Sequence, residues 1–117
     1  MILSTIKGQK CRQIGQVQMH VAVNGTAVTP VASGPDAFFV SAVNDLGVGQ
    51  YRVVVKEKSK IALFVSSIVA ITPGVTAHVV ATTTDSFTIQ CLDTAGAPLD
   101  ADIQIQWQHA DQLSYYF

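Results

Sequence analysis

Charged residues are scarce in this chain, making up 13% of its 117 residues, roughly half of the usual share of about 25%. Residues 1–35 contain three bases, Lys7, Lys10 and Arg12, and no acid. Three bases so widely spaced are too few to line a nucleic-acid groove. A surface with little charge is typical of a protein that packs against neighbouring proteins. We therefore expect a protein partner and no nucleic acid.

The signatures of catalysis, metal binding and redox chemistry are lacking. The two cysteines, Cys11 and Cys91, form no Cys-x-x-Cys motif, and the three histidines have no ligand-like spacing. No nucleophile-elbow or phosphate-loop motif occurs. Asp100 and Asp102 could hold a cation, although a solvated turn exit is the favoured interpretation. We expect no enzymatic activity and no cofactor.

Long hydrophobic runs are also missing. The largely apolar segment 61–71 is followed by Pro73-Gly74, far short of the roughly twenty residues that cross a bilayer. Near the N-terminus, Ser4, Thr5 and Lys7 interrupt what would be the apolar core of a signal peptide. We therefore expect no membrane partner, and synthesis in a cytoplasm.

Alternation of apolar and polar side chains is the dominant pattern that the chain does have. No segment has the period of a helix. The pattern predicts strands over residues 16–23, 26–31, 37–43, 49–55, 61–72, 75–82, 87–92 and 103–107. About eight strands at this spacing predict an all-β fold, an antiparallel, jelly-roll-like β-sandwich. An immunoglobulin-like strand order is equally compatible with the spacing.

The alternation also predicts which side chains face the core. Three inward rows are expected: Tyr51, Val53 and Val55; Phe87, Ile89 and Cys91; Ile103, Ile105 and Trp107. Asn24-Gly25 predicts a type I′ hairpin turn, residues 44–47 another turn, and Ser66-Ser67 a bend. The charge cluster at residues 56–60 is interpreted as a solvated hairpin loop that protects a sheet edge.

The two ends of the chain differ from its centre. We expect an extended arm over residues 1–15, the sandwich over 16–109 and an aromatic tail over 110–117. Residues 85–117 carry five aspartates and no lysine or arginine. Either the two ends lie together and neutralise each other, or the basic arm meets an acidic patch on another subunit. Likewise, the tail either caps the open end of the sandwich or anchors in a neighbour.

One series of motifs resembles a known group of proteins. It consists of Gly47-x-Gly49-x-Tyr51-x-Val53-x-Val55, then Thr82-Thr-Thr-Asp-Ser-Phe87-Thr-Ile, then Asp93-Thr-Ala-Gly96-Ala-Pro-Leu-Asp100-Ala-Asp102. This order is similar to that of small β-sandwich proteins of tailed bacteriophages, of the capsid decoration or cement type. The resemblance covers roughly residues 37–109. The chain departs from the pattern at residues 56–60, where an aromatic residue and a proline are usual, and in its extension beyond residue 109.

The resemblance implies a structural virion protein on the capsid surface, made in the cytoplasm of the bacterial host. Such a protein binds the outside of the assembled head, clamps neighbouring major capsid subunits and forms a homo-oligomer, a dimer or trimer. The candidate interaction residues are Lys7, Lys10, Arg12, Tyr115, Tyr116 and Phe117. The alternative is a receptor- or carbohydrate-binding module of a tail fibre or spike. Its aromatic candidates, Trp107 and Tyr51, are expected in the core instead.

Overall fold

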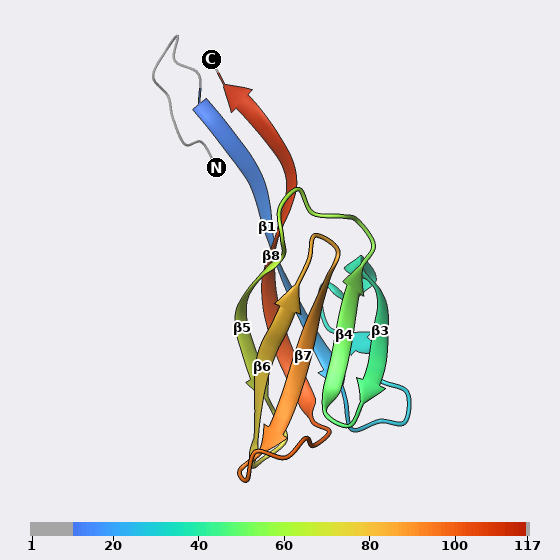
Figure 1. The fold of residues 1–117 in the computed structure, drawn as a ribbon. Helices are drawn as coiled ribbons and strands as arrows, with labels where there is room; N and C mark the ends of the chain where they lie inside the picture. The colour runs from blue at the N-terminus through green and yellow to red at the C-terminus, as the bar shows by residue number, and fades with distance from the viewer. Residues whose placement is uncertain (1–10, 117) are drawn as a thin grey trace.

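The computed structural model describes the backbone of residues 11–116 and the side chains of residues 18–109. It is all-β, with two antiparallel sheets of four strands each (Figure 1). The first sheet has the order β2-β1-β8-β5, with β2 Ala32–Ser33, β1 Cys11–Asn24, β8 Asp102–Tyr116 and β5 Phe64–Ala70. The second has the order β3-β4-β7-β6, with β3 Val40–Gly47, β4 Gln50–Val55, β7 Ser86–Asp93 and β6 Val75–Thr82. The expected antiparallel sandwich is thus confirmed.

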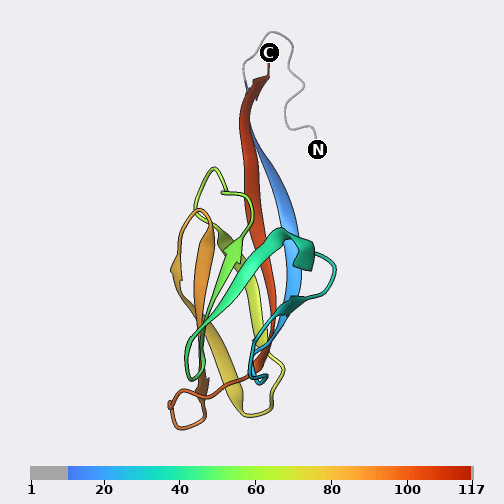
Figure 2. The ribbon, with the colours of Figure 1, turned by 90° about the vertical axis from the view of Figure 1, so that its right-hand side faces the viewer.

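The connections explain how the two layers are formed. The hairpin partners β3 and β4 lie in the second sheet, as do β6 and β7, whereas the segments that follow β4 and β7 cross to the first sheet. Figure 2 shows the two layers edge-on. As a result, the first sheet joins strands that are far apart in the sequence, β1 to β8 and β8 to β5.

The core lies between the sheets and consists of the expected rows. All nine residues of the three predicted inward rows are buried. Tyr51 of β4 and Trp107 of β8 come from opposite sheets and are fully buried. The Trp107 ring packs at 5.3 Å from the ring of Phe87. Cys91 is a buried free thiol, and burial raises its pKa to about 11.

The predicted hairpin at Asn24-Gly25 is wrong. A type I′ turn needs a positive φ at both central residues, and neither residue has one. The segment predicted as its return strand is a loop, and on the side of β1 away from β8 only the two residues of β2 pair with it. Gly25 serves another purpose, because a Cβ atom there would lie 2.6 Å from the Tyr51 ring. The glycine permits a close approach of backbone to ring.

Two further boundaries differ from the expectation. Ala37–Phe39 form a short 3-10 helix, η1, instead of the start of a strand. The next turn lies at Val48-Gly49 and not at residues 44–47, since β3 continues to Gly47. Gly49 has a φ of +70°, a conformation that glycine adopts without strain.

Candidate functional site: the ribbon end of the sandwich

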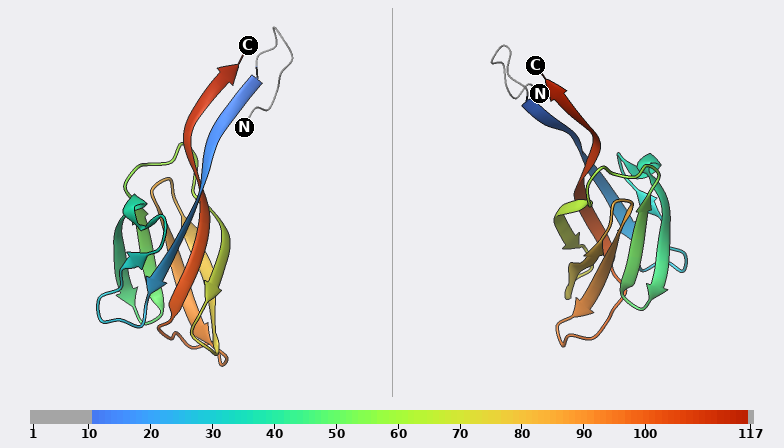
Figure 3. Two further views of the ribbon diagram at one scale, coloured as in Figure 1. Left: turned by 180° about the vertical axis from the view of Figure 1, so that it is seen from behind. Right: turned by 45° about the horizontal axis from the view of Figure 1, so that its top comes forward.

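Strands β1 and β8 continue together beyond the sandwich as a two-stranded extension (Figures 1 and 3). We call residues 11–17 of β1 and 110–116 of β8 the ribbon. The strands therefore pass through both predicted domain boundaries, since β1 begins at Cys11 and β8 ends at Tyr116. The long antiparallel ladder explains this, because pairing of the two strands does not stop where the sandwich ends.

Within the described part of the chain, both outer edges of the ribbon are unpaired. β2 pairs with β1 only at Ala22 and Val23, and the pairing of β5 with β8 reaches no further than Gln108. Unpaired edges present free backbone N–H and C=O groups to a partner. A two-stranded ribbon is also marginally stable in water by itself. Both properties favour pairing or packing with another protein.

A β-bulge lies where the ribbon leaves the body. The register changes from Gln16–Ala110 to Gly15–Gln112, so that Asp111 is the extra residue of β8. A bulge bends its strand and increases the local twist. Figure 3 shows the ribbon curving away from the axis of the sandwich beyond this region. The bulge thus sets the direction in which the ribbon points.

The base of the ribbon is anchored in the core. His109, which pairs with Val17 in the register, is only 2% exposed. Its ring packs edge-on against Phe39 at 4.7 Å. Trp107, two residues earlier on the same face, is fully buried. The body therefore fixes the position of the ribbon where it emerges.

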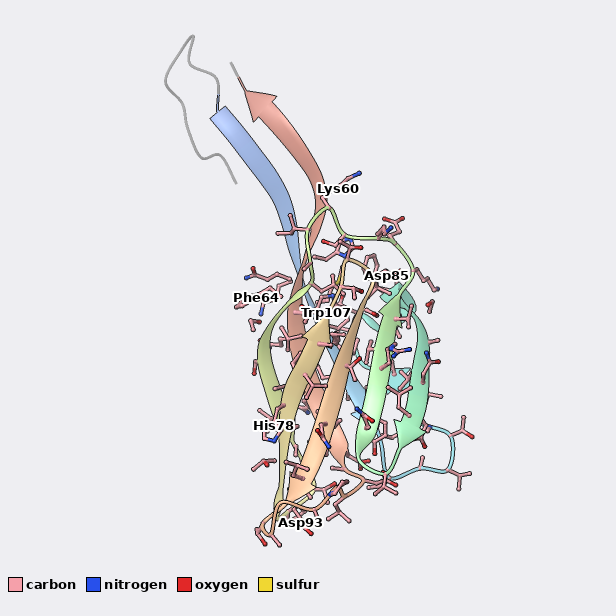
Figure 4. All side chains as sticks on the ribbon, in the orientation of Figure 1. Lys60, Phe64, His78, Asp85, Asp93 and Trp107 are labelled. Atoms are coloured by element: carbon pink, nitrogen blue, oxygen red, sulfur yellow. The ribbon has the colours of Figure 1, made fainter. Side chains whose placement is uncertain are left out.

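The charge cluster at residues 56–60, which we call the lysine loop, lies at the same end of the molecule (Figure 4). Lys56, Lys58 and Lys60 are exposed, whereas Ser59 is buried and its N–H donates to the Thr84 carbonyl at 2.7 Å. The interpretation as a hairpin loop is wrong, because the segment connects β4 to β5 in the other sheet. This crossing places the lysine loop, with Lys60, at the end of the sandwich from which the ribbon emerges (Figure 4).

An exposed aromatic side chain adjoins the lysine loop. Phe38, in η1, is 68% exposed. The Lys56 N–H donates to the Phe39 carbonyl at 2.9 Å, which fixes η1 beside the start of the loop. Exposed aromatics are enriched at protein interfaces. The sequence pattern did not identify Phe38 as a candidate, because it placed Phe38 in a strand without predicting whether its side chain is exposed.

The structure brings some of the predicted interaction residues together. Arg12 is opposite Tyr115 in the ladder, and Tyr116 is opposite Cys11. The two ends of the described segment therefore lie side by side, as one of the two expectations for the charges of the chain ends requires. As far as Tyr116, the tail runs away from the sandwich and does not fold back over it (Figure 1). Lys7, Lys10 and Phe117 lie outside the described residues.

A group of buried and partly buried hydrogen bonds, the tyrosine lock, closes the opposite end of the sandwich. The Tyr51 hydroxyl lies 2.9 Å from both the Gly25 carbonyl and Asp100 Oδ1. The same carboxylate oxygen accepts the Gly49 N–H at 2.7 Å. Burial, followed by the hydrogen bond to Asp100, raises the pKa of Tyr51 above its ordinary value. The role of the lock is structural.

The two aspartates considered as a cation site have separate partners. Asp102 Oδ1 accepts hydrogen bonds from the Thr26 hydroxyl at 2.7 Å and from the Thr26 N–H, whereas Asp100 belongs to the tyrosine lock. Among the described residues, no group of three potential ligands could hold a metal ion. The two carboxylates stabilise loops near the ends of β4 and β8.

One shallow groove, of about 210 Å³, lies between the loop before β2 and strand β3. It is lined by Pro30, Val31, Ala32, Ala37, Val40, Ser41, Ala42 and Val43. This lining offers one hydroxyl group and no acid, base or thiol. The convergent polar groups that a catalytic site needs are not found there.

Comparisons with known proteins found no relative of this chain. No protein-family model, curated protein or solved structure matches the chain. In the part of the chain that the structure describes, no helix is long and apolar enough to cross a membrane.

Proposed function

We propose that this protein is a structural assembly protein, without enzymatic activity, that docks onto neighbouring protein subunits through its ribbon end. The observation that carries the proposal is the ribbon itself, with both of its edges unpaired within residues 11–116. Such edges bind partners by adding strands, in which main-chain hydrogen bonds supply the affinity. The anchored base positions the ribbon before binding, which lowers the entropic cost of association.

The lysine loop and Phe38 support the same docking surface. The loop presents three exposed lysines against one exposed acid, Glu57, so it favours an acidic partner surface. Charges at the rim of an interface act chiefly on the rate of association and its salt dependence. Phe38 adds exposed apolar area beside the loop. The loop lies at the ribbon end of the sandwich, and η1 contacts the base of the ribbon through Phe39 and His109.

The proposed partner is the major capsid protein of a tailed bacteriophage, as the resemblance to capsid decoration proteins implies. In this proposal the protein is made in the host cytoplasm and binds the outside of the assembled head. A protein that binds the assembled lattice but not free subunits stabilises that lattice by mass action. The ribbon and the lysine loop reach neighbouring subunits and hold them together.

The first experiment measures the copy number of this protein in purified virions of its source, relative to the major shell protein, by quantitative mass spectrometry. A ratio near one, or a simple fraction of it, is the expected result. A few copies per particle would favour the alternative, a receptor-binding module of a tail fibre or spike. Absence from virions would refute both assignments.

A second experiment tests the ribbon. Deleting residues 1–12 removes the ladder pairs formed by Cys11 and Arg12 and leaves the part of β1 within the sandwich. We expect loss of head binding in a co-sedimentation assay, with an unchanged near-UV circular dichroism spectrum. The control is Thr94→Glu, in the exposed loop between β7 and β8 at the opposite end, which should bind like the wild type. Full head binding by the truncated protein would exclude a role of the N-terminal residues 1–12.

A further inference from the structure

The open edge of β5 has features that the proposed docking through the ribbon does not require. We propose that β5 pairs in antiparallel fashion with β5 of a second copy of this chain, across a two-fold axis. The proposal concerns the free protein and holds whether or not the ribbon binds a capsid.

This edge lacks the protection that sheet edges normally have. In the described part of the chain β5 pairs with β8 alone, and its sequence, Phe-Val-Ser-Ser-Ile-Val-Ala, contains no charged residue and no proline. Edge strands are usually guarded by charges, prolines or short length. At the other edge of the same sheet, β2 has only two residues and lies between Pro30 and Pro35. Within the sandwich, the β2 edge of this sheet is therefore protected, whereas the β5 edge is open.

In β5, apolar and polar residues follow the same order from either end of the segment 64–69. Two apolar residues precede the Ser66-Ser67 pair and two follow it. The exposure has the same symmetry: Phe64 and Val69 are 60% and 56% exposed, while Val65 and Ile68 are both half-buried. A strand with this pattern matches an antiparallel copy of itself.

The bulge in β5 places the residues on either side of the serine pair at equal distances from it along the ladder. Five successive residues of β8, from Gln108 back to Gln104, pair with Phe64, Val65, Ser67, Ile68 and Val69 of β5. The bulge at Ser66 therefore lets the serine pair occupy a single position in the ladder. In a regular antiparallel pair, a two-fold axis perpendicular to the sheet passes through one ladder position. Here the axis falls on the serine pair.

Pairing about this axis places like faces together. Phe64 of one copy lies across from Val69 of the other, both on the outer face, and Val65 lies across from Ile68 on the inner face. Aromatic and β-branched side chains form favourable cross-strand pairs. The pairing brings no like charges together, because the strand contains no charged residue. Because the strand matches an antiparallel copy of itself, the pattern favours a second copy of this chain as the partner. An unrelated partner would not require such a symmetric pattern.

In the dimer, the β2-β1-β8-β5 sheets of the two copies would form one continuous sheet of eight strands, since each copy contributes four. The axis reverses the strand direction, so the two ribbons would point in opposite directions. If the proposed function also holds, one dimer could engage two separate groups of subunits, which increases binding through multivalency. This last consequence depends on the proposed function, whereas the dimer does not.

The test is sedimentation equilibrium of the full chain over a concentration series. We expect a monomer–dimer equilibrium. Val69→Lys, on the exposed face of β5, should raise the dissociation constant at least about tenfold, because it removes the apolar contact between Val69 and Phe64 of the partner, which the two-fold axis repeats. Val80→Lys, at a comparably exposed position on β6 (51%), is the matched control and should leave the equilibrium unchanged. Combining Phe64→Glu with Val69→Lys should restore dimerisation, because the pairing places opposite charges across from each other.

A cross-linking variant tests the position of the axis. Ser67→Cys in a Cys11→Ser background should form an intermolecular disulfide under mild oxidation, because opposed residues of antiparallel strands have Cα atoms about 4.5–5.5 Å apart, within the range that disulfides span. Val80→Cys in the same background should remain monomeric on a non-reducing gel. A wild-type chain that is monomeric at every concentration would overturn the proposal. So would a dimer that Val80→Lys dissociates and Val69→Lys does not.

Discussion

The tyrosine lock yields a sharp prediction about stability. Replacing Tyr51 with phenylalanine keeps the buried ring and removes only the hydroxyl group. That hydroxyl lies within hydrogen-bonding distance of the Gly25 carbonyl and the Asp100 carboxylate. Tyr51 is fully buried, so the Gly25 carbonyl loses its donor inside the protein.

The size of the effect follows from what remains after the substitution. Hydrogen bonds to charged groups contribute about 1.5–3 kcal/mol, and a buried acceptor left without its donor costs a similar amount. Asp100 keeps the Gly49 N–H, which limits the loss. The ring stays, so little apolar burial is lost. We therefore expect Tyr51→Phe to lower the free energy of unfolding by about 2–3 kcal/mol.

Urea unfolding measures this change directly. The midpoint should fall while the slope stays constant, as expected for a loss of stability without a change in the surface exposed. Ser41→Ala is the control, since it removes an exposed hydroxyl that donates to the Val54 carbonyl at 3.2 Å, and it should cost less than about 0.5 kcal/mol.

A double-mutant cycle assigns the effect to the pair. Tyr51→Phe and Asp100→Asn should show a coupling energy of at least about 0.5 kcal/mol, because they alter the same hydrogen bond. A loss below about 0.5 kcal/mol for Tyr51→Phe, or additive losses in the cycle, would refute the structural role of the lock.

Three further predictions concern other parts of the molecule. Gly49→Ala should destabilise by more than about 1 kcal/mol, because the glycine has a φ of +70° and a Cβ atom would lie 2.6 Å from the Cys91 carbonyl oxygen; thermal unfolding measures the loss, and an unchanged melting temperature would contradict it. The free energy of unfolding should fall as the pH rises above about 9, because Cys91, with a pKa raised to about 11, and Tyr51 hold their protons in the folded chain and lose them when unfolded. Denaturant titrations from pH 8 to 11 test this, and Cys91→Ala should show a smaller fall. Replacing the three lysines of the lysine loop with glutamine should slow head binding at low salt and reduce its salt dependence, whereas identical kinetics for variant and wild type would show that the loop lies outside the interface.

Local alternation predicted three inward rows of the core correctly. The inward rows that contain Tyr51, Phe87 and Trp107 were identified correctly because a strand with one face in the core must place apolar residues at every second position. The bend at Ser66-Ser67 was also confirmed, since the register shifts there. Sequence signals for turns were less reliable. Asn24-Gly25 has the composition of a type I′ turn, but packing of Tyr51 against the Gly25 backbone decides its conformation.

The candidate site depends on contacts between distant segments. The ends of β1 and β8 pair over a separation of about a hundred residues, and neither end shows a clear strand period by itself. The lysine loop was visible as a charge cluster, but its position beside the ribbon follows from the crossing of β4 to β5 between the sheets. Similarly, the symmetry of β5 emerges only when the bulge is counted in its pairing with β8.

The sequence by itself thus determined the all-β class, the antiparallel sandwich and three inward rows of its core, because each depends on a period-two pattern that neighbouring residues share. Only the tertiary structure decided which strands are edges, that residues 11–17 and 110–116 pair as a ribbon, and that the lysine loop lies at the same end of the sandwich. Those features depend on strand order and on register, and both are set by how the whole core packs and not by any one segment.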